Sequence, residues 1–255
     1  MIDLHSHILR GIDDGPRTLE ESVEIAAAAA ADGTTVIAAT PHIRDDYPTE
    51  ASAMEYRLYE LRAELDRAGV ALEVRPGGEF ALEWLARVEP GERRRFGLGG
   101  NPRYLLVETP YYGWPLGLAD SLFQLQASGV VPVLAHPERN AEVQGDPARL
   151  DPLVRAGVLV QVTAASLDGR IGRRAEACAR TLIESGLCHL LASDAHHASV
   201  RAVGLAAAAE AVADEALARW LVHDVPRAIL DDTELPPRPE PSGKKKNWLS
   251  RALGG

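Results

Sequence analysis

Short runs of β-forming residues alternate with longer Ala- and Leu-rich helical stretches over the first 235 residues. Strands that alternate with helices are the signature of βα units around a parallel sheet. The seven predicted strands are residues 2–5, 35–40, 71–77, 104–108, 131–135, 159–163 and 189–193. The predicted helices include residues 19–32, 51–68, 117–128, 147–156, 175–185 and 200–214. Seven units of this kind predict an α/β domain with the shape of a barrel.

The composition of the chain changes after residue 235. The final stretch, PPRPEPSGKKKNWLSRALGG, begins with prolines that favour an extended chain, and it holds all the lysines of the protein. We therefore predict a domain over residues 1–235 and a flexible Pro-rich linker with a basic tail over residues 236–255. Residues 244–253 could form a small basic helix that makes weak contact with a membrane or a partner, and a solvated end is the simpler alternative.

Overall composition narrows the class of protein. With 46% hydrophobic and 25% charged residues, the chain is typical of globular proteins. A formal net charge of -10 argues against a nucleic-acid binder and favours cations as ligands. The apolar run 25–31 is too short to span a bilayer, the first residues do not resemble a signal peptide, and Cys178 and Cys188 are too few for a disulfide framework. We therefore expect a cytoplasmic protein.

Histidines and acidic residues follow the predicted strands. Alternate residues of an extended chain point the same way, and the carboxyl ends of parallel strands meet at one face of a barrel. We therefore expect these side chains to share one cleft, where metal ions would supply the partners that buried charges require. Nitrogen and oxygen ligands suit Mn, Fe or Zn. The side chains are His5, His7, His42, Glu79, Glu108, His136, Asp194 and His196.

Two arginines add an argument about the substrate. Arg139 follows His136 by three residues and Arg201 follows Asp194 by seven, so both are expected at the same face. A guanidinium group is a planar, permanently charged fork that matches phosphate oxygens. The sequence therefore predicts a phosphate ester as substrate.

Several motifs together resemble one known family. Asp3-Leu4-His5-Ser6-His7 has the Asp-x-His-x-His form that is the hallmark of the PHP (polymerase and histidinol phosphatase) superfamily. Within it, the segments DDGP at 13–16, HPERN at 136–140 and SDAH at 193–196 resemble the bacterial manganese-dependent tyrosine-protein phosphatases of capsule and exopolysaccharide loci. The resemblance extends to about residue 231. It implies a PHP-type distorted (β/α)7 TIM-like barrel over residues 1–235 that binds three divalent ions, with Mn expected and Fe or Zn as alternatives.

The resemblance also implies which residues hold each ion. Asp13 stays an alternative to Asp14, because one residue of register decides which carboxylate faces inward. We expect His197 to support a ligand or lie at the surface, and His189 and His223 to be structural. The three sets are His5, His7, Glu79 and Asp194; Glu79, Glu108 and His136, with Glu79 as the bridge; and Asp14, His42 and His196.

The implied reaction is hydrolysis of a phosphate monoester. A water that bridges two cations loses its proton near neutral pH, and the resulting hydroxide would attack phosphorus. Arg139 and Arg201 would bind the other phosphate oxygens and stabilise the charge of the transition state. Neither cysteine lies in the anion-binding loop that a cysteine-dependent phosphatase requires. No general acid can be named from the sequence.

We expect a phosphotyrosine-protein phosphatase that regulates exopolysaccharide or capsule synthesis through a bacterial tyrosine kinase. The first alternative is a small-molecule phosphatase of the same superfamily, such as histidinol-phosphatase. It shares the ligand set, so only aromatic residues of the pocket wall could distinguish the two. These are Tyr47, Tyr111, Tyr112 and Trp114. A third hypothesis is a non-catalytic, metal-stabilised binding module. Such a module would lack one of the metal ligands, whereas every expected ligand position is filled in this sequence. A homo-oligomer is a further possibility.

Overall fold

The structure, a computed structural model, describes residues 1–198 and 204–240. Its strands are β1 (Ile2–Ser6), β2 (Val36–Ala39), β3 (His42–Arg44), β4 (Tyr47–Pro48), β5 (Glu73–Pro76), β6 (Glu79–Ala81), β7 (Tyr104–Glu108), β8 (Val131–Ala135), β9 (Leu159–Thr163) and β10 (Leu190–Ala192). Its α-helices are α1 (Leu19–Ala31), α2 (Ala51–Ala68), α3 (Pro90–Arg95), α4 (Leu118–Ala127), α5 (Ala141–Gly145), α6 (Asp151–Arg155), α7 (Arg173–Glu184), α8 (Leu205–Ala211), α9 (Glu215–Arg219) and α10 (Val225–Leu230).

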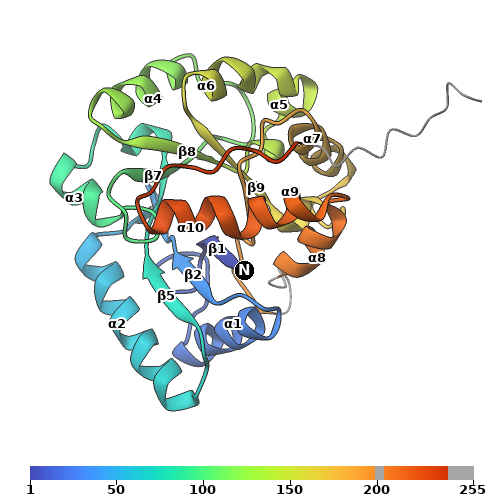
Figure 1. The fold of residues 1–255 in the computed structure, drawn as a ribbon. Helices are drawn as coiled ribbons and strands as arrows, with labels where there is room; N and C mark the ends of the chain where they lie inside the picture. Colours follow the sequence, from blue (N-terminus) through green and yellow to red (C-terminus); the bar gives the residue numbers. More distant parts are fainter. Residues whose placement is uncertain (199–203, 241–255) are drawn as a thin grey trace, which may run out of the picture.

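The strands follow one another around a distorted barrel (Figure 1). Parallel ladders join β1, β2 and β5 in one sheet and β10, β9, β8, β7, β6 and β3 in another, where β4 adds an antiparallel edge. Two residues separate β2 from β3, and two residues separate β5 from β6. β2 pairs with β5, and β3 pairs with β6, so the two interrupted strands run side by side along their whole length. A strand is therefore present at each of the seven predicted positions. Two of these strands, β2 and β5, continue after an interruption as β3 and β6.

The seam between β10 and β1 is the open part of the barrel. In the described residues it is held by one isolated parallel bridge, Ser6 to Ala195. Around it, Asp194 N donates to His5 O and His7 N donates to Ala195 O, both at 2.8 Å. The chain segments that carry His5, His7 and Asp194 are thus joined directly by their backbones.

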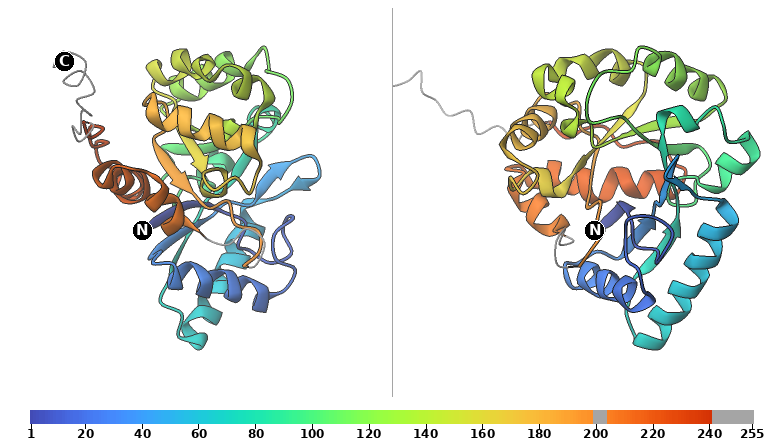
Figure 2. Two further views of the ribbon diagram at one scale, coloured as in Figure 1. Left: turned by 90° about the vertical axis from the view of Figure 1, so that its right-hand side faces the viewer. Right: turned by 180° about the vertical axis from the view of Figure 1, so that it is seen from behind.

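Helices surround the strands, with α1 and α2 on one side and α4 to α7 on the opposite side (Figure 2). α2 shows why the pattern of its sequence predicts it, because Met54, Leu58, Leu61 and Leu65 fall on one buried face and Gly69 caps it at φ 68°. α1 begins at a capping box between Thr18 and Glu21. These amphipathic faces and the apolar strand residues form one core.

Some predicted elements needed correction. The predicted helix 147–156 is instead a 3-10 turn, Pro147–Leu150, followed by α6. Pro147 and Pro152 each lie in the first turn of one of these elements, because proline is tolerated there but interrupts the interior of a helix. Of the predicted helix 200–214, α8 is observed, and residues 199–203 lie outside the described part. The pattern did not predict α3 or α5, which are only six and five residues long. It also did not predict the helical stretch 215–230, in which α9, a π-helical turn over residues 220–224 and α10 follow one another without a break.

The start of the predicted linker contacts the domain. Pro236 O accepts a 2.9 Å hydrogen bond from the Trp220 indole, and the Arg238 guanidinium donates to Ile183 O at 2.6 Å. Residues 241–255, with Lys244 to Lys246, lie outside the described residues. In the described part of the chain, none of the helices has the length and apolar character needed to cross a membrane.

Candidate metal centre

The nine predicted metal ligands lie together at the carboxyl ends of the strands. All are buried except Asp14, whose side chain is 41% exposed. Their ligand atoms form four overlapping groups, each with all atoms within 4.8 Å of one another. The groups are His7, Asp14, His42 and His196; His5, Glu79 and His136; His5, His7 and Asp194; and His42, Glu79 and Glu108.

The two histidines of the N-terminal motif form the centre of the cluster. His5 Nε2 and His7 Nε2 lie 3.3 Å apart. Asp194 Oδ1 lies 3.5 Å from the first and 3.3 Å from the second. The Glu79 carboxylate approaches the same two nitrogens at 3.5 and 3.3 Å. These four side chains, which the family resemblance assigns to one ion, therefore present converging donor atoms.

Glu79 also reaches two further histidines. Its Oε1 lies 2.8 Å from His136 Nε2, and its Oε2 lies 2.9 Å from His42 Nδ1. Glu108 lies 3.9 Å from each of these nitrogens. Glu79 thus approaches four histidines, and His42 joins this region as well as the Asp14 group.

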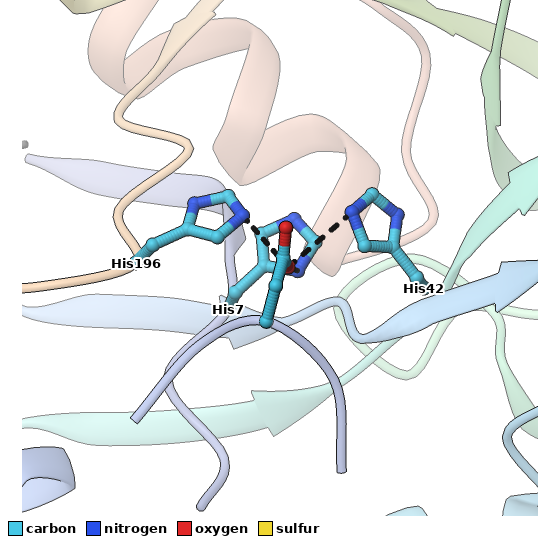
Figure 3. A group of neighbouring side chains, drawn as sticks. His7, His42 and His196 are labelled. Carbon is cyan, nitrogen blue, oxygen red and sulfur yellow. Dashed lines mark ion pairs between the residues drawn. The ribbon is translucent and has the colours of Figure 1, made fainter. Parts of the chain in front are cut away.

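The third group surrounds the carboxylate of Asp14. Figure 3 shows His7, His42 and His196 gathered around one side-chain carboxylate. Asp14 Oδ1 lies 3.1 Å from His196 Nε2 and 3.5 Å from His42 Nε2. Asp13 lies behind His7 instead, with Oδ2 2.7 Å from His7 Nδ1 and 3.1 Å from the His42 backbone nitrogen. Asp14, and not Asp13, therefore faces the cluster.

Gln161 supports the cluster and was not among the predicted site residues. Its Oε1 lies 2.9 Å from His5 Nδ1 and accepts from His136 N at 3.3 Å. An acceptor at Nδ1 fixes the ring so that Nε2 is free to bind a metal. The signal in the sequence was a single amide in the otherwise apolar strand β9, which ends at Thr163.

Arg139 lies at the edge of the cluster, and Arg201 lies outside the described residues. The Arg139 side chain is only 7% exposed. Its Nη2 donates to Asp194 Oδ2 and, at 3.0 Å, to Thr163 Oγ1. The neighbouring Glu138 is fully buried and accepts from Thr163 N and Ser166 Oγ. Arg139 is therefore held beside Asp194 by residues of β9 and the loop that follows it.

Two of the clustered residues have an unusual backbone conformation. His136 has φ 32° and Asp194 has φ 52°, both in the left-handed region. Residues other than glycine rarely occupy this region, and those that do are concentrated at functional sites. The strain at these two positions is consistent with a requirement for exact placement of their side chains.

The electrostatics of the cluster fit divalent cations. Burial opposes ionisation of Glu79, but the charges of His5 and His42 hold its pKa well below the ordinary value. Burial and the nearby Glu79 raise the pKa of Glu108 to about 8. His42 Nδ1 and Glu79 Oε2 are buried and lie 2.9 Å apart, but neither makes a hydrogen bond of good geometry with the other or with any other described residue. A cation between such donors would remove the repulsion between carboxylates and satisfy the orphaned atoms.

The predicted wall residues separate into two kinds. The Tyr47 ring stacks on His42 with centroids 5.9 Å apart, and the Tyr111 ring lies 6.2 Å from His136. Tyr112 is 84% exposed, whereas Trp114 packs on the hydrophobic core. Tyr47 and Tyr111 therefore flank the cluster directly.

The remaining histidines and the cysteines lie apart from these groups. His189 Nδ1 accepts from Val160 N, and His223 pairs with Asp224, which fits structural roles. His197 is exposed. Cys178 and Cys188 are buried, and burial raises the pKa of both thiols, that of Cys178 to about 12. Neither is a candidate nucleophile.

Comparisons with known proteins agree with this geometry. The sequence model of the family described as capsular polysaccharide synthesis, CpsB/CapC, matches residues 1–231. The chain is 36% identical over 202 residues to the tyrosine-protein phosphatase YwqE of Bacillus subtilis, covering 79% of each chain. It is 34% identical over 200 residues to the putative tyrosine-protein phosphatase CapC of Staphylococcus aureus, covering 77% of each.

A solved structure matches nearly the whole chain. It comes from the crystal structures of YwqE from Bacillus subtilis and CpsB from Streptococcus pneumoniae, which are described as unique metal-dependent tyrosine phosphatases. The TM-score is 0.83 at 31% identity, and the match covers 94% of this chain and 99% of the other. The resemblance inferred from the motifs and the predicted fold class are therefore confirmed.

Proposed function

Because this chain belongs to the capsular polysaccharide synthesis family CpsB/CapC, we propose that it is a metal-dependent protein-tyrosine phosphatase. The observation that carries the proposal is the buried cluster in which His5, His7, Glu79 and Asp194 converge. The names of the relatives YwqE and CapC support phosphotyrosine as the substrate class. The arrangement of the ligands supports hydrolysis without a covalent enzyme intermediate.

The donor set supports three divalent ions, with Mn proposed and Fe or Zn as alternatives. His5, His7, Glu79 and Asp194 would hold the first ion, and the other predicted ligands would hold the remaining two. Bound divalent ions would supply positive charge to the phosphate oxygens and acidify a water molecule near neutral pH. The remaining ligands are Asp14, His42, Glu108, His136 and His196.

The chain's own residues would orient the substrate. Arg139 is held beside Asp194 and would bind phosphate oxygens that do not react, and we propose the same role for Arg201. Asp13 and Gln161 hold the rings of His7 and His5 so that their Nε2 atoms face inward. A phenolate leaving group has a pKa of about 10 in its free state, so its departure places little demand on a general acid.

The proposed partner is a phosphotyrosine protein, specifically a bacterial tyrosine kinase of a capsule or exopolysaccharide system. The description of the family as capsular polysaccharide synthesis proteins supports this choice. We place the reaction in the cytoplasm because such a kinase would present its phosphotyrosines there, and the basic residues 244–246 would favour the vicinity of an anionic membrane.

The direct test combines metal analysis with turnover. The purified protein should release phosphate from phosphotyrosine peptides, and chelation should abolish this activity. Asp194→Ala should lower bound metal and reduce kcat/KM by about 100-fold or more, because removal of a partner of buried charges disrupts the site. Asp168→Ala is the control, because Asp168 pairs only with the exposed Arg170 among the described residues.

Two results would overturn the proposal. Cleavage of histidinol phosphate without cleavage of phosphotyrosine peptides would favour the small-molecule phosphatase. Full activity and full metal content in Asp194→Ala would contradict the proposed centre.

A further inference from the structure

A cavity of about 440 Å³ lies beside the metal cluster and shares Arg139 with it. The segments that follow three consecutive strands, β7, β8 and β9, form it. Tyr111 and Tyr112 follow β7, Arg139 and Gln144 follow β8, and Arg174 lies in the first turn of α7, after β9. Its size is within the range of about 300 to 1,000 Å³ that is usual for ligand pockets. The cavity is therefore continuous with the face on which the proposed reaction takes place.

The lining of this cavity is cationic and aromatic. It includes two arginines and two tyrosines, and its described lining holds no carboxylate, although the chain has a net charge of -10. Tyr111 is 44% exposed and Tyr112 is 84% exposed. Exposed tyrosines beside a cavity are well suited to contact a peptide, because they bury a large area at little cost in conformational entropy.

The two arginines differ in what they already bind. Arg139 donates to Asp194 and Thr163, so its charge is compensated within the cluster. Arg174 is exposed and has neither an ion pair nor a side-chain hydrogen bond to any residue that the structure describes. Its neighbours on the same segment are paired, Arg170 with Asp168 and Arg180 with Glu176. Arg174 is thus the available cation of this cavity.

Building on the proposed phosphatase function, we propose that this cavity binds the residues next to the phosphotyrosine and that Arg174 selects substrates with an anionic side chain there. The cluster would receive the phosphate, Arg139 would lie at the boundary, and the flanking residue would extend between Tyr111, Tyr112 and Ile171 toward Arg174. The anion is either the carboxylate of Asp or Glu or a second phosphotyrosine. Both present oxygens that a guanidinium group binds.

The test measures selectivity between matched peptides. Phosphotyrosine peptides that carry Glu, Gln, Tyr or a second phosphotyrosine within two residues are compared by kcat/KM for the wild type, Arg174→Ala and Arg174→Glu. We expect the Glu-to-Gln ratio to fall about fivefold in Arg174→Ala, as suits one exposed ion pair, and to invert in Arg174→Glu. The doubly phosphorylated peptide, compared with its Tyr counterpart, shows whether phosphate or carboxylate is preferred. Arg173→Ala is the matched control, because Arg173 is the neighbouring exposed arginine of α7 and does not line the cavity.

The outcomes separate this proposal from the proposed function. If wild type cleaves the peptides but all variants keep the wild-type ratios, the role of Arg174 is wrong and the phosphatase function stands. An equal loss of selectivity in Arg173→Ala would also overturn it, because the effect would then reflect general charge. If wild type cleaves no phosphotyrosine peptide, the proposed function itself fails.

Discussion

Asp13 and Asp14 are adjacent in the chain, yet their carboxylates serve different positions. Asp13 accepts from the Gly15 backbone at 3.0 Å and holds His7 Nδ1, so it orients a ligand without facing the cluster. Asp14 projects between His42 and His196. The chemistry of single residues therefore depends on which of two identical side chains faces the cluster. It also depends on the carboxylate or amide oxygen that accepts from the Nδ1 atom of a histidine in the cluster and so orients its ring.

This division predicts different responses to the same substitution. Asp14→Asn removes an anionic ligand, so kcat/KM should fall about 100-fold and should not recover at high metal concentration. Asp13→Asn keeps an acceptor of the same shape but loses its charge, so metal affinity should fall about 10- to 100-fold and activity should recover as metal is added. Titration of activity with Mn measures both. Identical behaviour of the two variants would contradict the assignment, and Asp168→Asn serves as a control.

At the scale of elements, glycine and proline decide how strands reach the site. A Cβ on Gly77 would lie 2.9 Å from Thr40 Cγ2, and a Cβ on Gly78 would lie 2.6 Å from Ile43 Cδ1. Side chains at these positions would separate the interrupted strands, so the two glycines allow β6 to continue beside β3 with Glu79 opposite His42. The interruptions therefore set the position of the bridging carboxylate.

These elements also show what the sequence could and could not predict. The seven strand positions and the residues that follow them were predictable, because periodicity and turn residues are local signals. The continuation into β3 and β6 was not predictable, because Pro41 and Gly77-Gly78 are residues that usually end strands. Only the pairing of β3 with β6 shows that the chain stays extended after them. The role of Gln161 depends on His5, 156 positions away in the chain, so no local pattern contains it.

His189, directly before β10, couples the packing of this element to pH. Its Nδ1 accepts from Val160 N at 3.1 Å, and burial, assisted by the positive charge of Arg238, lowers its pKa to about 4. In the unfolded chain the pKa is about 6.5. Between these values the unfolded state binds more protons, so this residue lowers the free energy of unfolding as pH falls from 6.5 toward 4.

His189→Asn should remove this contribution, because Asn Oδ1 takes the position of His Nδ1, can accept from Val160 N and does not titrate. The variant should therefore lose about 2 kcal/mol less of its free energy of unfolding than the wild type between pH 8 and pH 5. Urea unfolding at pH 8 and pH 5 measures it, and the pH 8 values report any change in packing alone. If the free energy of unfolding falls by the same amount from pH 8 to pH 5 in the wild type and in the variant, His189 does not carry the effect.

At the scale of the whole molecule, the proposed ligands join nearly the entire domain. They come from β1 and from the ends or continuations of most of the other strands, from His5 to His196 along the chain. They meet beside the open seam between β1 and β10. An unfolded chain cannot assemble such a site, so binding of metal ions there would be coupled to folding. Metal ions would also offset part of the net charge of -10 and the repulsion among buried carboxylates.

The unfolding temperature should therefore depend on metal concentration. Each independent site at a hundredfold excess over its Kd adds about 2.7 kcal/mol, which for a domain of this size raises Tm by roughly 5 to 10 °C. Calorimetry of the protein in chelator and in increasing Mn measures the shift. Asp194→Ala should lose much of it because Asp194 touches both central histidines, whereas Asp168→Ala should keep it. A Tm independent of metal, or an unchanged shift in Asp194→Ala, would mean that the cluster does not link the strands through bound cations.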